Sequence, residues 1–291
     1  MKQTAATIGF FDGVHQGHRF LLSELRHLGA QEAVSTLVLT FDTHPLAVVR
    51  PGTQPALLST PEERLTALRK EADAVVVLPF TIEMAQQTAE QFLQILHDNH
   101  GVRHLLMGHD HRFGCDGRGL TPADYTTLGH RVGIHVHHAP KAPSPASSSL
   151  IRSYLLGGNA TVAAELLGRP YSLTGTVVHG RKVGRTIGFP TANLCVPPSR
   201  LVPDLGIYAC RATIAGTTHN AVTSIGQRPT LNNGTDVTIE TYVLDFEGDL
   251  YDQEMTLHFV RRLRSEMKFE SLDILQQQIA RDCDKARQVL A

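Results

Sequence analysis

The residues that decide the fold are Gly9-Phe10-Phe11-Asp12-Gly13-Val14-His15-Gln16-Gly17-His18. They follow a strand-like run, contain the glycines of a turn, and lead into a helical pattern that continues through Leu25. His15 and His18 are three residues apart, so they share one face of that helix. The N-terminus of a helix offers unpaired N–H groups and partial positive charge, which suit phosphate. The stretch therefore predicts a site for a polyanionic ligand.

Two glycines and two histidines give this stretch its expected chemistry. Gly13 and Gly17 have no Cβ, so a polyanion can approach the backbone closely. His15 and His18 can donate hydrogen bonds to phosphoryl oxygens as charge builds in a transition state. One alternative is an ordinary strand–turn–helix with two exposed histidines. A metal site is a second alternative, although no cysteine or third ligand lies nearby at a spacing typical of metal sites.

The bulk composition is typical of a globular protein with a substantial core. The chain has 291 residues, enough for two domains, with 42% hydrophobic and 19% charged residues. The formal net charge of -1 and the absence of a long basic run give no electrostatic support to nucleic-acid binding. The four cysteines form no C-x-x-C pair, and neither a signal peptide nor a membrane-spanning run is expected. We therefore expect a cytoplasmic protein with no nucleic-acid or membrane partner.

Strand-like and helical runs alternate through the first half of the chain. Strands are expected at residues 34–41, 74–78, 104–107 and 133–137, with helices at 61–70 and 88–97. This alternation predicts an α/β domain with a mainly parallel, doubly wound, Rossmann-like sheet. Because such sheets bind ligands at the carboxyl ends of their strands, the polar residues after Ile8, Leu39 and Met107 are expected to gather at one edge.

A loop rich in proline and serine, residues 140–149, leads into Ser147-Ser148-Ser149-Leu150-Ile151-Arg152. Hydroxyl groups followed by an arginine at the start of a helix indicate a triphosphate clamp. The alternative is plain N-capping of the helix by Ser149, and the spacing of the residues alone favours this alternative.

The composition changes near Leu167, where helical patterns give way to short strand-like runs separated by turns. We therefore predict a domain boundary that separates residues 1–167 from residues 168–291. The second half contains five strand-like runs, at 173–178, 207–214, 219–225, 237–244 and 255–260, and then one helix at 272–290. This order predicts an antiparallel β-barrel with a terminal helix.

A glycine-rich string opens the second half, from Gly175 to Asn193. Gly180, Gly184 and Gly188 would keep a loop open to a close ligand, while Arg181, Lys182 and Arg185 supply positive charge for phosphates. Thr191 and Asn193 offer oxygen ligands of the kind that Mg²⁺ accepts beside nucleotide phosphates. The string lacks the Walker A pattern, and its alternative interpretation is a glycine-rich hairpin.

Two independent sets of motifs resemble those of the bacterial bifunctional riboflavin kinase/FAD synthetases. Residues 9–18 resemble the G-x-F-D-G-V-H-x-G-H signature of the H-x-G-H nucleotidyltransferases, and residues 147–152 are similar to their S-S-T-x-I-R motif. The string 180–193 resembles the riboflavin kinase signature G-x-x-x-G-R-x-x-G-x-P-T-A-N. Residues 206–208, 224–230 and 240–246 also match in order, and residues 263–269 resemble the loop on the flavin side.

Three residues depart from the family pattern. Thr43 stands where the family often has proline, Ser149 where it has threonine, and His111 where it usually has phenylalanine. Replacing threonine by serine keeps the hydroxyl group, whereas His111 removes an aromatic side chain from the expected nucleotide site.

The resemblance implies a reaction for each half. The barrel would convert riboflavin and ATP to FMN and ADP, with Glu240 taking the proton of the riboflavin 5′-hydroxyl group. The N-terminal domain would convert FMN and ATP to FAD and pyrophosphate. There His15 and His18 would stabilise the α-phosphate and the departing pyrophosphate, and the β- and γ-phosphates would be bound by Ser148, Ser149 and Arg152.

The resemblance also implies the remaining site residues and partners. Both steps would require Mg²⁺, with Thr191 and Asn193 as its ligands in the barrel. The other residues expected to bind nucleotide or phosphate are Gly9, Asp12, Gly17, Asp110, Gly180, Gly184, Arg185, Gly188 and Pro190. Four aromatic side chains are candidates for packing on the isoalloxazine ring or for the core: Tyr208, Tyr242, Phe189 and Phe269. The expected partners are riboflavin, FMN and ATP, for a monomer or a weak homo-oligomer.

Two other functions stay open from the sequence. One is a riboflavin kinase whose first domain is weakened by changes such as His111. The other is a non-catalytic flavin-binding protein, against which the candidate base and metal ligands argue. A generic cytidylyltransferase or pantetheine-phosphate adenylyltransferase would explain the first half and leave the barrel motifs unexplained.

Overall fold

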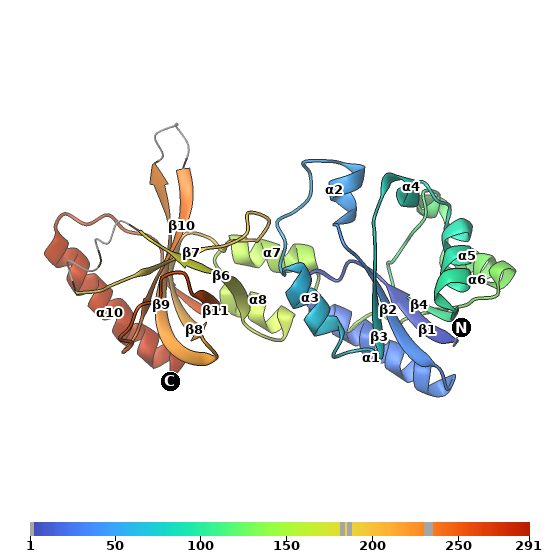
Figure 1. Cartoon of the computed structure of the whole chain (residues 1–291), viewed down its shortest axis with the longest axis horizontal. Helices are drawn as coiled ribbons and strands as arrows, with labels where there is room; N and C mark the ends of the chain where they lie inside the picture. Colours follow the sequence, from blue (N-terminus) through green and yellow to red (C-terminus); the bar gives the residue numbers. More distant parts are fainter. Residues whose placement is uncertain (1–2, 181–183, 185–187, 230–234) are drawn as a thin grey trace. The chain divides into compact units, whose positions relative to one another are not determined.

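The structure is a computed structural model that describes residues 3–180, 184, 188–229 and 235–291. The chain divides into two compact units, Met1–Ala146 and Ser147–Ala291. Figure 1 shows a sheet flanked by helices in the first unit and a barrel with helices in the second. The two units are described separately below.

The first unit is built on a five-stranded parallel sheet with the strand order β3-β2-β1-β4-β5. The strands are β1 (Thr4–Ile8), β2 (Ser35–Phe41), β3 (Ala74–Leu78), β4 (Val102–Met107) and β5 (His135–His138). The helices are α1 (Gln16–Gln31), α2 (Pro45–Val49), α3 (Pro61–Leu68), α4 (Ile82–Ala85), α5 (Ala89–His100) and α6 (Pro122–Val132), with short 3₁₀ turns η1 (Asp12–Val14) and η2 (Gly117–Gly119). The predicted doubly wound α/β fold is confirmed.

Helices cover both faces of this sheet. Consecutive strand residues such as Ala5 and Ala6 belong to two separate hydrophobic clusters, because successive side chains of a strand point to opposite faces of the sheet. One cluster contains Phe92 of α5 and Tyr125 of α6, and the other contains Leu22 of α1 and Leu68 of α3. With both faces covered, the carboxyl ends of the strands are left to open onto the polar loops that follow them.

The helix boundaries follow from local sequence chemistry. Thr60 caps α3 and Pro61 occupies its first position, while Glu63 completes a capping box by accepting from the Thr60 backbone N–H. The helix predicted at residues 61–70 thus begins at the expected residue and ends at Leu68. At the other end of the helices, Gly101 closes α5 with a φ of 65°, a left-handed conformation that glycine adopts without strain.

The second unit is a closed antiparallel barrel with the strand order β10-β7-β6-β11-β8-β9. Its strands are β6 (Tyr171–Val178), β7 (Ala192–Cys195), β8 (Gly206–Ile214), β9 (Thr217–Pro229), β10 (Thr235–Val243) and β11 (Glu254–Arg264), and its helices are α7 (Ser148–Leu156), α8 (Ala160–Leu167) and α10 (Leu272–Leu290). Strand β10 alternates as a barrel wall must, with Ile239, Thr241 and Val243 buried and Glu240 and Tyr242 on the other face. The predicted barrel with a terminal helix is confirmed.

Helices α7 and α8 pack with the barrel. The Thr161 hydroxyl on α8 donates to the backbone oxygen of Val260 on β11 at 3.3 Å. The backbone N–H of Asp204 donates to the Leu155 oxygen on α7 at 2.9 Å. The contacts within the chain therefore divide it between Ala146 and Ser147, whereas the composition predicts a domain boundary at residue 167, after α7 and α8.

Candidate active sites

The turn between β1 and α1 has an unusual backbone. Phe11, Gly13 and Val14 all have positive φ angles, of 56°, 76° and 41°. The Asp12 carboxylate holds this turn by accepting hydrogen bonds from the backbone N–H groups of Leu58 at 3.0 Å and Ser59 at 3.1 Å. Because Asp12 is 3% exposed, its contacts make it an anchor of the turn. These contacts fix the strained segment that leads to His15.

His15 and His18 lie together at the start of α1, as expected. Their rings stack with centroids 3.6 Å apart and an interplanar angle of 19°. His15 is the N-cap of α1, and its Nδ1 accepts the His18 backbone N–H at 3.3 Å. A neutral imidazole whose Nδ1 accepts has its proton on Nε2, so His15 offers an Nε2–H donor.

His18 is held in its neutral form. Burial lowers its pKa well below the ordinary value, and the neighbouring His15 lowers it further. The His18 ring also packs edge-on against Phe11, with centroids 5.2 Å apart. Within the described part of the chain, its buried Nδ1 has no hydrogen-bond partner. An anionic ligand beside this ring would oppose both effects by favouring the protonated form.

The glycines of this stretch are needed for packing as well as for any ligand. A Cβ on Gly17 would lie 2.8 Å from the backbone oxygen of Ala146 and 3.2 Å from the His15 ring. A Cβ on Gly9 would lie 3.1 Å from the Phe11 ring. The sequence predicts that a polyanion approaches the backbone at Gly17. In the structure, the group that lies close to Gly17 is the backbone oxygen of Ala146.

Sequence reasoning missed a buried arginine at the carboxyl edge of the sheet. Arg64 on α3 is 3% exposed and donates to the backbone oxygens of Phe10 at 3.2 Å and Phe41 at 2.7 Å. Its guanidinium carbon also lies 3.9 Å from the centroid of the Phe10 ring. Burial lowers its pKa, although Asp12 and Asp42 act in the opposite direction. The signal was available, because Arg64 is one helical turn before the buried Leu68 and so lies on the buried face.

The loop after β4 contains Asp110 and His111. Asp110 is exposed, whereas His111 is half-buried and tilted toward Phe113 with ring centroids 6.0 Å apart. Burial lowers the pKa of His111 to about 4, against the opposing effect of Asp110. At neutral pH His111 is therefore an uncharged ring.

The serine-rich motif begins α7, which belongs to the second unit. Ser147 caps the helix by accepting the Leu150 backbone N–H at 3.2 Å, so the cap lies two residues before Ser149, to which the alternative assigned it. Ser148 and Arg152 are half-buried, and Ser149 is exposed. The hydroxyl of Ser149 is thus not used as the helix cap.

In the barrel, the candidate base and the candidate metal ligands lie together. Glu240 on β10 pairs directly with Asn193 on β7, and the Thr191 hydroxyl donates to the Glu240 carboxylate at 3.3 Å. All three side chains are half-buried. Residues that are 47 or more positions apart in the sequence therefore meet on the outer face of the barrel, as the predicted site requires.

Two glycines of the string 180–193 make room around these ligands. A Cβ on Gly180 would lie 2.3 Å from the amide nitrogen of Asn193, and a Cβ on Gly184 would lie 2.2 Å from the Phe189 backbone oxygen. Gly188 has a φ of 80°, with open space for 4 Å around the position that a Cβ would take, and Pro190 is exposed. Arg185, also expected here, lies outside the described residues.

The donor set suits a hard cation. A hydroxyl, an amide oxygen and a carboxylate are the oxygen ligands that Mg²⁺ takes, usually together with substrate phosphates and waters. Within the described ranges, no group of three or more histidine, cysteine or acidic residues could hold a metal by itself. Thr191 and Asn193, with the Glu240 carboxylate beside them, therefore fit an ion that arrives with a nucleotide.

Of the four candidate aromatic residues, one is core. Tyr208 is fully buried and donates its hydroxyl to the Asp204 backbone oxygen at 2.6 Å, so it does not contact a ligand on the surface. Phe189 and Tyr242 pack edge-to-face at 5.3 Å beside a cluster formed with α10. Phe269 is half-buried, with the Arg264 guanidinium carbon 5.8 Å from its ring centroid.

Comparison with known proteins covers both units. The FAD synthetase family matches residues 1–150, and the riboflavin kinase family matches residues 167–290. A protein of Pseudomonas fluorescens named bifunctional riboflavin kinase/FMN adenylyltransferase is 36% identical over 98% of this chain and 93% of its own length. A protein of the same name from Escherichia coli K12 is 37% identical over 97% of this chain and 91% of its own.

A crystal structure described as a macrolide-efflux protein from Streptococcus pneumoniae has the same fold. It is 29% identical, with a TM-score of 0.90 over 99% of this chain and 95% of that one. Among the described residues of the present chain, no helix is both long and apolar enough to cross a membrane.

Proposed function

Because the chain belongs to the family of bifunctional riboflavin kinase/FMN adenylyltransferases, we propose that its barrel makes FMN and its N-terminal domain makes FAD. The barrel transfers the γ-phosphoryl group of ATP to riboflavin, and the N-terminal domain transfers the adenylyl group of a second ATP to FMN. The observation that supports the kinase most directly is the meeting of Thr191, Asn193 and Glu240 on one face of the barrel. We assign the activities to residues 168–291 and 1–167, respectively.

Glu240 is the proposed base of the kinase step. Its carboxylate accepts the proton of the riboflavin 5′-hydroxyl group as that oxygen bonds to the γ-phosphorus and the bond to ADP breaks. The Thr191 hydroxyl, which donates to Glu240 at 3.3 Å, orients the carboxylate. Positioning and charge neutralisation contribute most of the rate in such a reaction, and backbone N–H groups at Gly180, Gly184 and Gly188 are proposed to contribute to both.

Thr191 and Asn193 are the proposed protein ligands of Mg²⁺. When bound, the ion neutralises charge on the phosphates and orients them for in-line transfer. The register that pairs Glu240 with Asn193 keeps the proposed base beside these proposed ligands.

His15 and His18 are the proposed phosphate-binding residues of the adenylyl transfer. An oxygen of the FMN phosphate attacks the α-phosphorus of ATP, pyrophosphate leaves, and no covalent enzyme intermediate forms. His15 donates from Nε2, and the neutral His18 gains a proton or a hydrogen bond only as the polyanion arrives. Ser148, Ser149 and Arg152, in the first turns of α7, are the further residues that we propose to bind phosphate.

The test is a time course with the purified chain, riboflavin, ATP and Mg²⁺, in which chromatography separates riboflavin, FMN and FAD. We expect FMN to rise and fall as FAD accumulates. Accumulation of FMN alone, even when FMN is supplied, would favour a kinase with a silent first domain. A stable flavin complex without turnover would favour the non-catalytic binding protein.

Two variants separate the sites. Glu240→Ala is expected to abolish FMN formation and to spare FAD formation from supplied FMN, whereas His15→Ala is expected to do the reverse. Glu247→Ala and His27→Ala, which remove an exposed carboxylate and an exposed imidazole, are the matched controls. Loss of both activities in a folded Glu240→Ala protein would refute the assignment to two sites.

A further inference from the structure

Strand β10 has two flanks, and they differ in chemistry. On one side β7 brings Asn193 opposite Glu240. On the other side β9 brings Ser224 opposite Glu240 and Gly226 opposite Thr238. Because alternate residues share a face, Gly226 and Ser224 lie on the same outer surface as Glu240. A substrate that reaches Glu240 with its phosphoryl donor on the β7 side must place its own body toward β9.

The segment after β11 runs along that second flank. A Cβ on Gly226 would lie 2.5 Å from a carboxylate oxygen of Glu266, so the Glu266 side chain lies directly over Gly226. This segment and the first turn of α10 expose Met267 (56%), Leu272 (59%) and Ile274 (47%). The segment that covers Gly226 and the start of the helix that follows it therefore expose apolar side chains of the kind that contact a planar aromatic ring.

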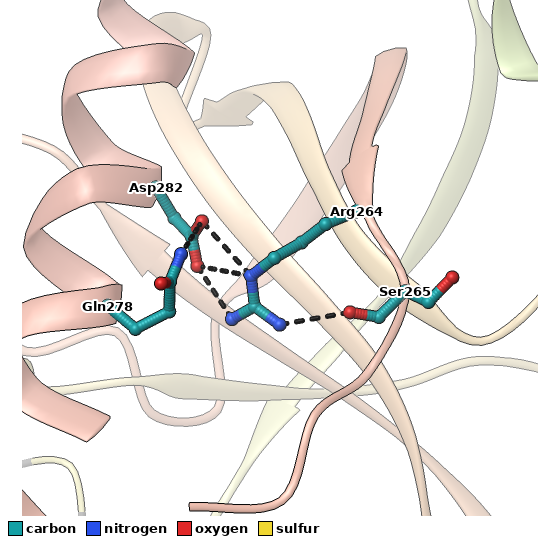
Figure 2. Close-up of polar contacts among 4 residues, drawn as sticks. All are labelled: Arg264, Ser265, Gln278 and Asp282. Atoms are coloured by element: carbon teal, nitrogen blue, oxygen red, sulfur yellow. Dashed lines mark hydrogen bonds and ion pairs between the residues drawn. The ribbon is translucent and has the colours of Figure 1, made fainter. Parts of the chain in front are cut away.

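A buried ion pair joins the residue that precedes this segment to the middle of α10. Arg264, the last residue of β11, donates from Nε to both carboxylate oxygens of Asp282 on α10 at 3.1 and 3.0 Å, and from a terminal nitrogen at 2.7 Å (Figure 2). Gln278 donates to the same carboxylate at 3.0 Å, and Arg264 also donates to the Ser265 backbone oxygen at 2.9 Å. The side chains of Arg264 and Asp282 are only 15% and 2% exposed. We call Arg264, Asp282 and Gln278 the clamp.

The clamp contributes more to the orientation of the chain segments that it joins than to the stability of the fold. A guanidinium that binds a carboxylate through two nitrogens defines both distance and orientation. Burying such a pair is costly, and apolar residues of similar volume often stabilise a fold as well or better. A feature of this kind is explained by what it orients, which here is the chain between residues 264 and 282.

The helix at the far end of the clamp is itself fixed to the catalytic strand. Cys283 and Ala286 of α10 pack in a cluster with Val222 of β9 and Leu244, which follows β10. Tyr242, two residues after Glu240, packs against the same cluster. The clamp thus sets the segment 265–269 relative to the strand that contains Glu240.

We propose that Arg264, Asp282 and Gln278 are positioning residues for the acceptor substrate. They hold the segment 265–269 beside Gly226, so that the ring system of riboflavin lies on the β9 flank while ATP occupies the β7 flank. The inference rests on the proposed kinase activity of the barrel. It assigns the clamp to flavin binding and gives it no direct contact with the reacting atoms.

The test compares Asp282→Asn and Arg264→Lys with the wild-type chain. Asp282→Asn keeps the shape but loses the charge, and Arg264→Lys keeps the charge but loses the two-pronged contact. We expect the KM for riboflavin to rise by about tenfold in Asp282→Asn, with kcat within about threefold and the KM for ATP unchanged. The KM for riboflavin of Arg264→Lys should lie between those of Asp282→Asn and the wild type. The rate of FAD formation from supplied FMN should not change in either variant.

The matched control is Asp245→Asn, which breaks the exposed ion pair of Asp245 with Arg287 on the same helix as Asp282, at 3.0 Å. We expect its kinetic constants to stay within about twofold of wild type. If Asp282→Asn does not fold, Gln278→Met tests the same carboxylate by removing one hydrogen bond, and should raise the KM for riboflavin by about threefold.

An unchanged KM for riboflavin in the folded variant, or an equal rise in the KM for ATP, would overturn the inference. Failure of the kinase proposal is distinguishable, because the wild-type chain would then form no FMN. A wild-type chain that turns over riboflavin normally, with clamp variants that match it, would refute the positioning role alone.

Discussion

Replacing His111 by phenylalanine should change how the stability of the first unit depends on pH. Burial lowers the pKa of this histidine from 6.5 to about 4 in the folded protein. The unfolded chain therefore binds the proton more readily, and stability falls as the pH drops from 6.5 toward 4. Phenylalanine has no proton to bind, so this part of the pH dependence should disappear in the variant.

The size of the effect follows from the two pKa values. Proton linkage gives a loss of about 2 kcal/mol in the unfolding free energy between pH 7 and pH 5 for a group whose pKa changes from 6.5 to about 4. Because His111 is half-buried, this figure is an upper bound. Any steric penalty of the larger ring is the same at both pH values and cancels in the comparison.

Native-state hydrogen exchange measures the effect within the first unit. The amides of Leu105 and Leu106 on β4 are buried and report the opening free energy of this sheet. We expect the loss between pH 7 and pH 5 to be smaller in His111→Phe than in wild type by up to about 2 kcal/mol. An identical loss in both proteins, or an NMR titration of His111 with a midpoint near its ordinary value of 6.5, would refute the reasoning.

Two further substitutions test contacts made by glycine. Gly17→Ala places a methyl group 2.8 Å from the Ala146 backbone oxygen and 3.2 Å from the His15 ring, so we expect a loss of about 1–3 kcal/mol in the stability of the first unit and slower FAD formation, measured by denaturation and by FMN turnover. Stability equal to wild type would show that the segment can move away. Gly180→Ala displaces the Asn193 amide, from which its Cβ would lie 2.3 Å, so the kinase should need about tenfold more Mg²⁺ for half-maximal rate, whereas FAD formation should not. An unchanged Mg²⁺ requirement would remove Asn193 from the set of metal ligands.

The elements and their order follow from local sequence chemistry. The capping box at Thr60, the proline at position 61 and the alternation of apolar runs each act over a few residues, and the structure agrees with them. The meeting of Thr191 and Glu240 could be expected only from the family motifs, because strand register is set by pairing between distant segments. Local pattern alone would have placed Glu240 on a solvent-facing strand.

Other parts of the sites depend on contacts that no local pattern contains. Asp12 binds the backbone of Leu58 and Ser59, which are 46 and 47 residues away. The packing of α7 and α8 against the barrel likewise depends on tertiary contacts, such as that of Thr161 with Val260. The composition shows where strand-like sequence begins, near residue 167. It does not predict which elements the preceding helices pack against.

The closed barrel also determines the order in which the two units can fold during synthesis. Closure pairs Tyr171 on β6 with Phe259 on β11, so the ring cannot be completed until nearly the whole chain has left the ribosome. The sheet of the first unit needs only residues up to β5, which ends at His138. A chain that stops before β11 would hold a finished sheet and a row of strands with open edges, which is the form that neighbouring chains can extend into aggregates. Quality control of this protein is therefore expected to act mainly on chains that end within the barrel.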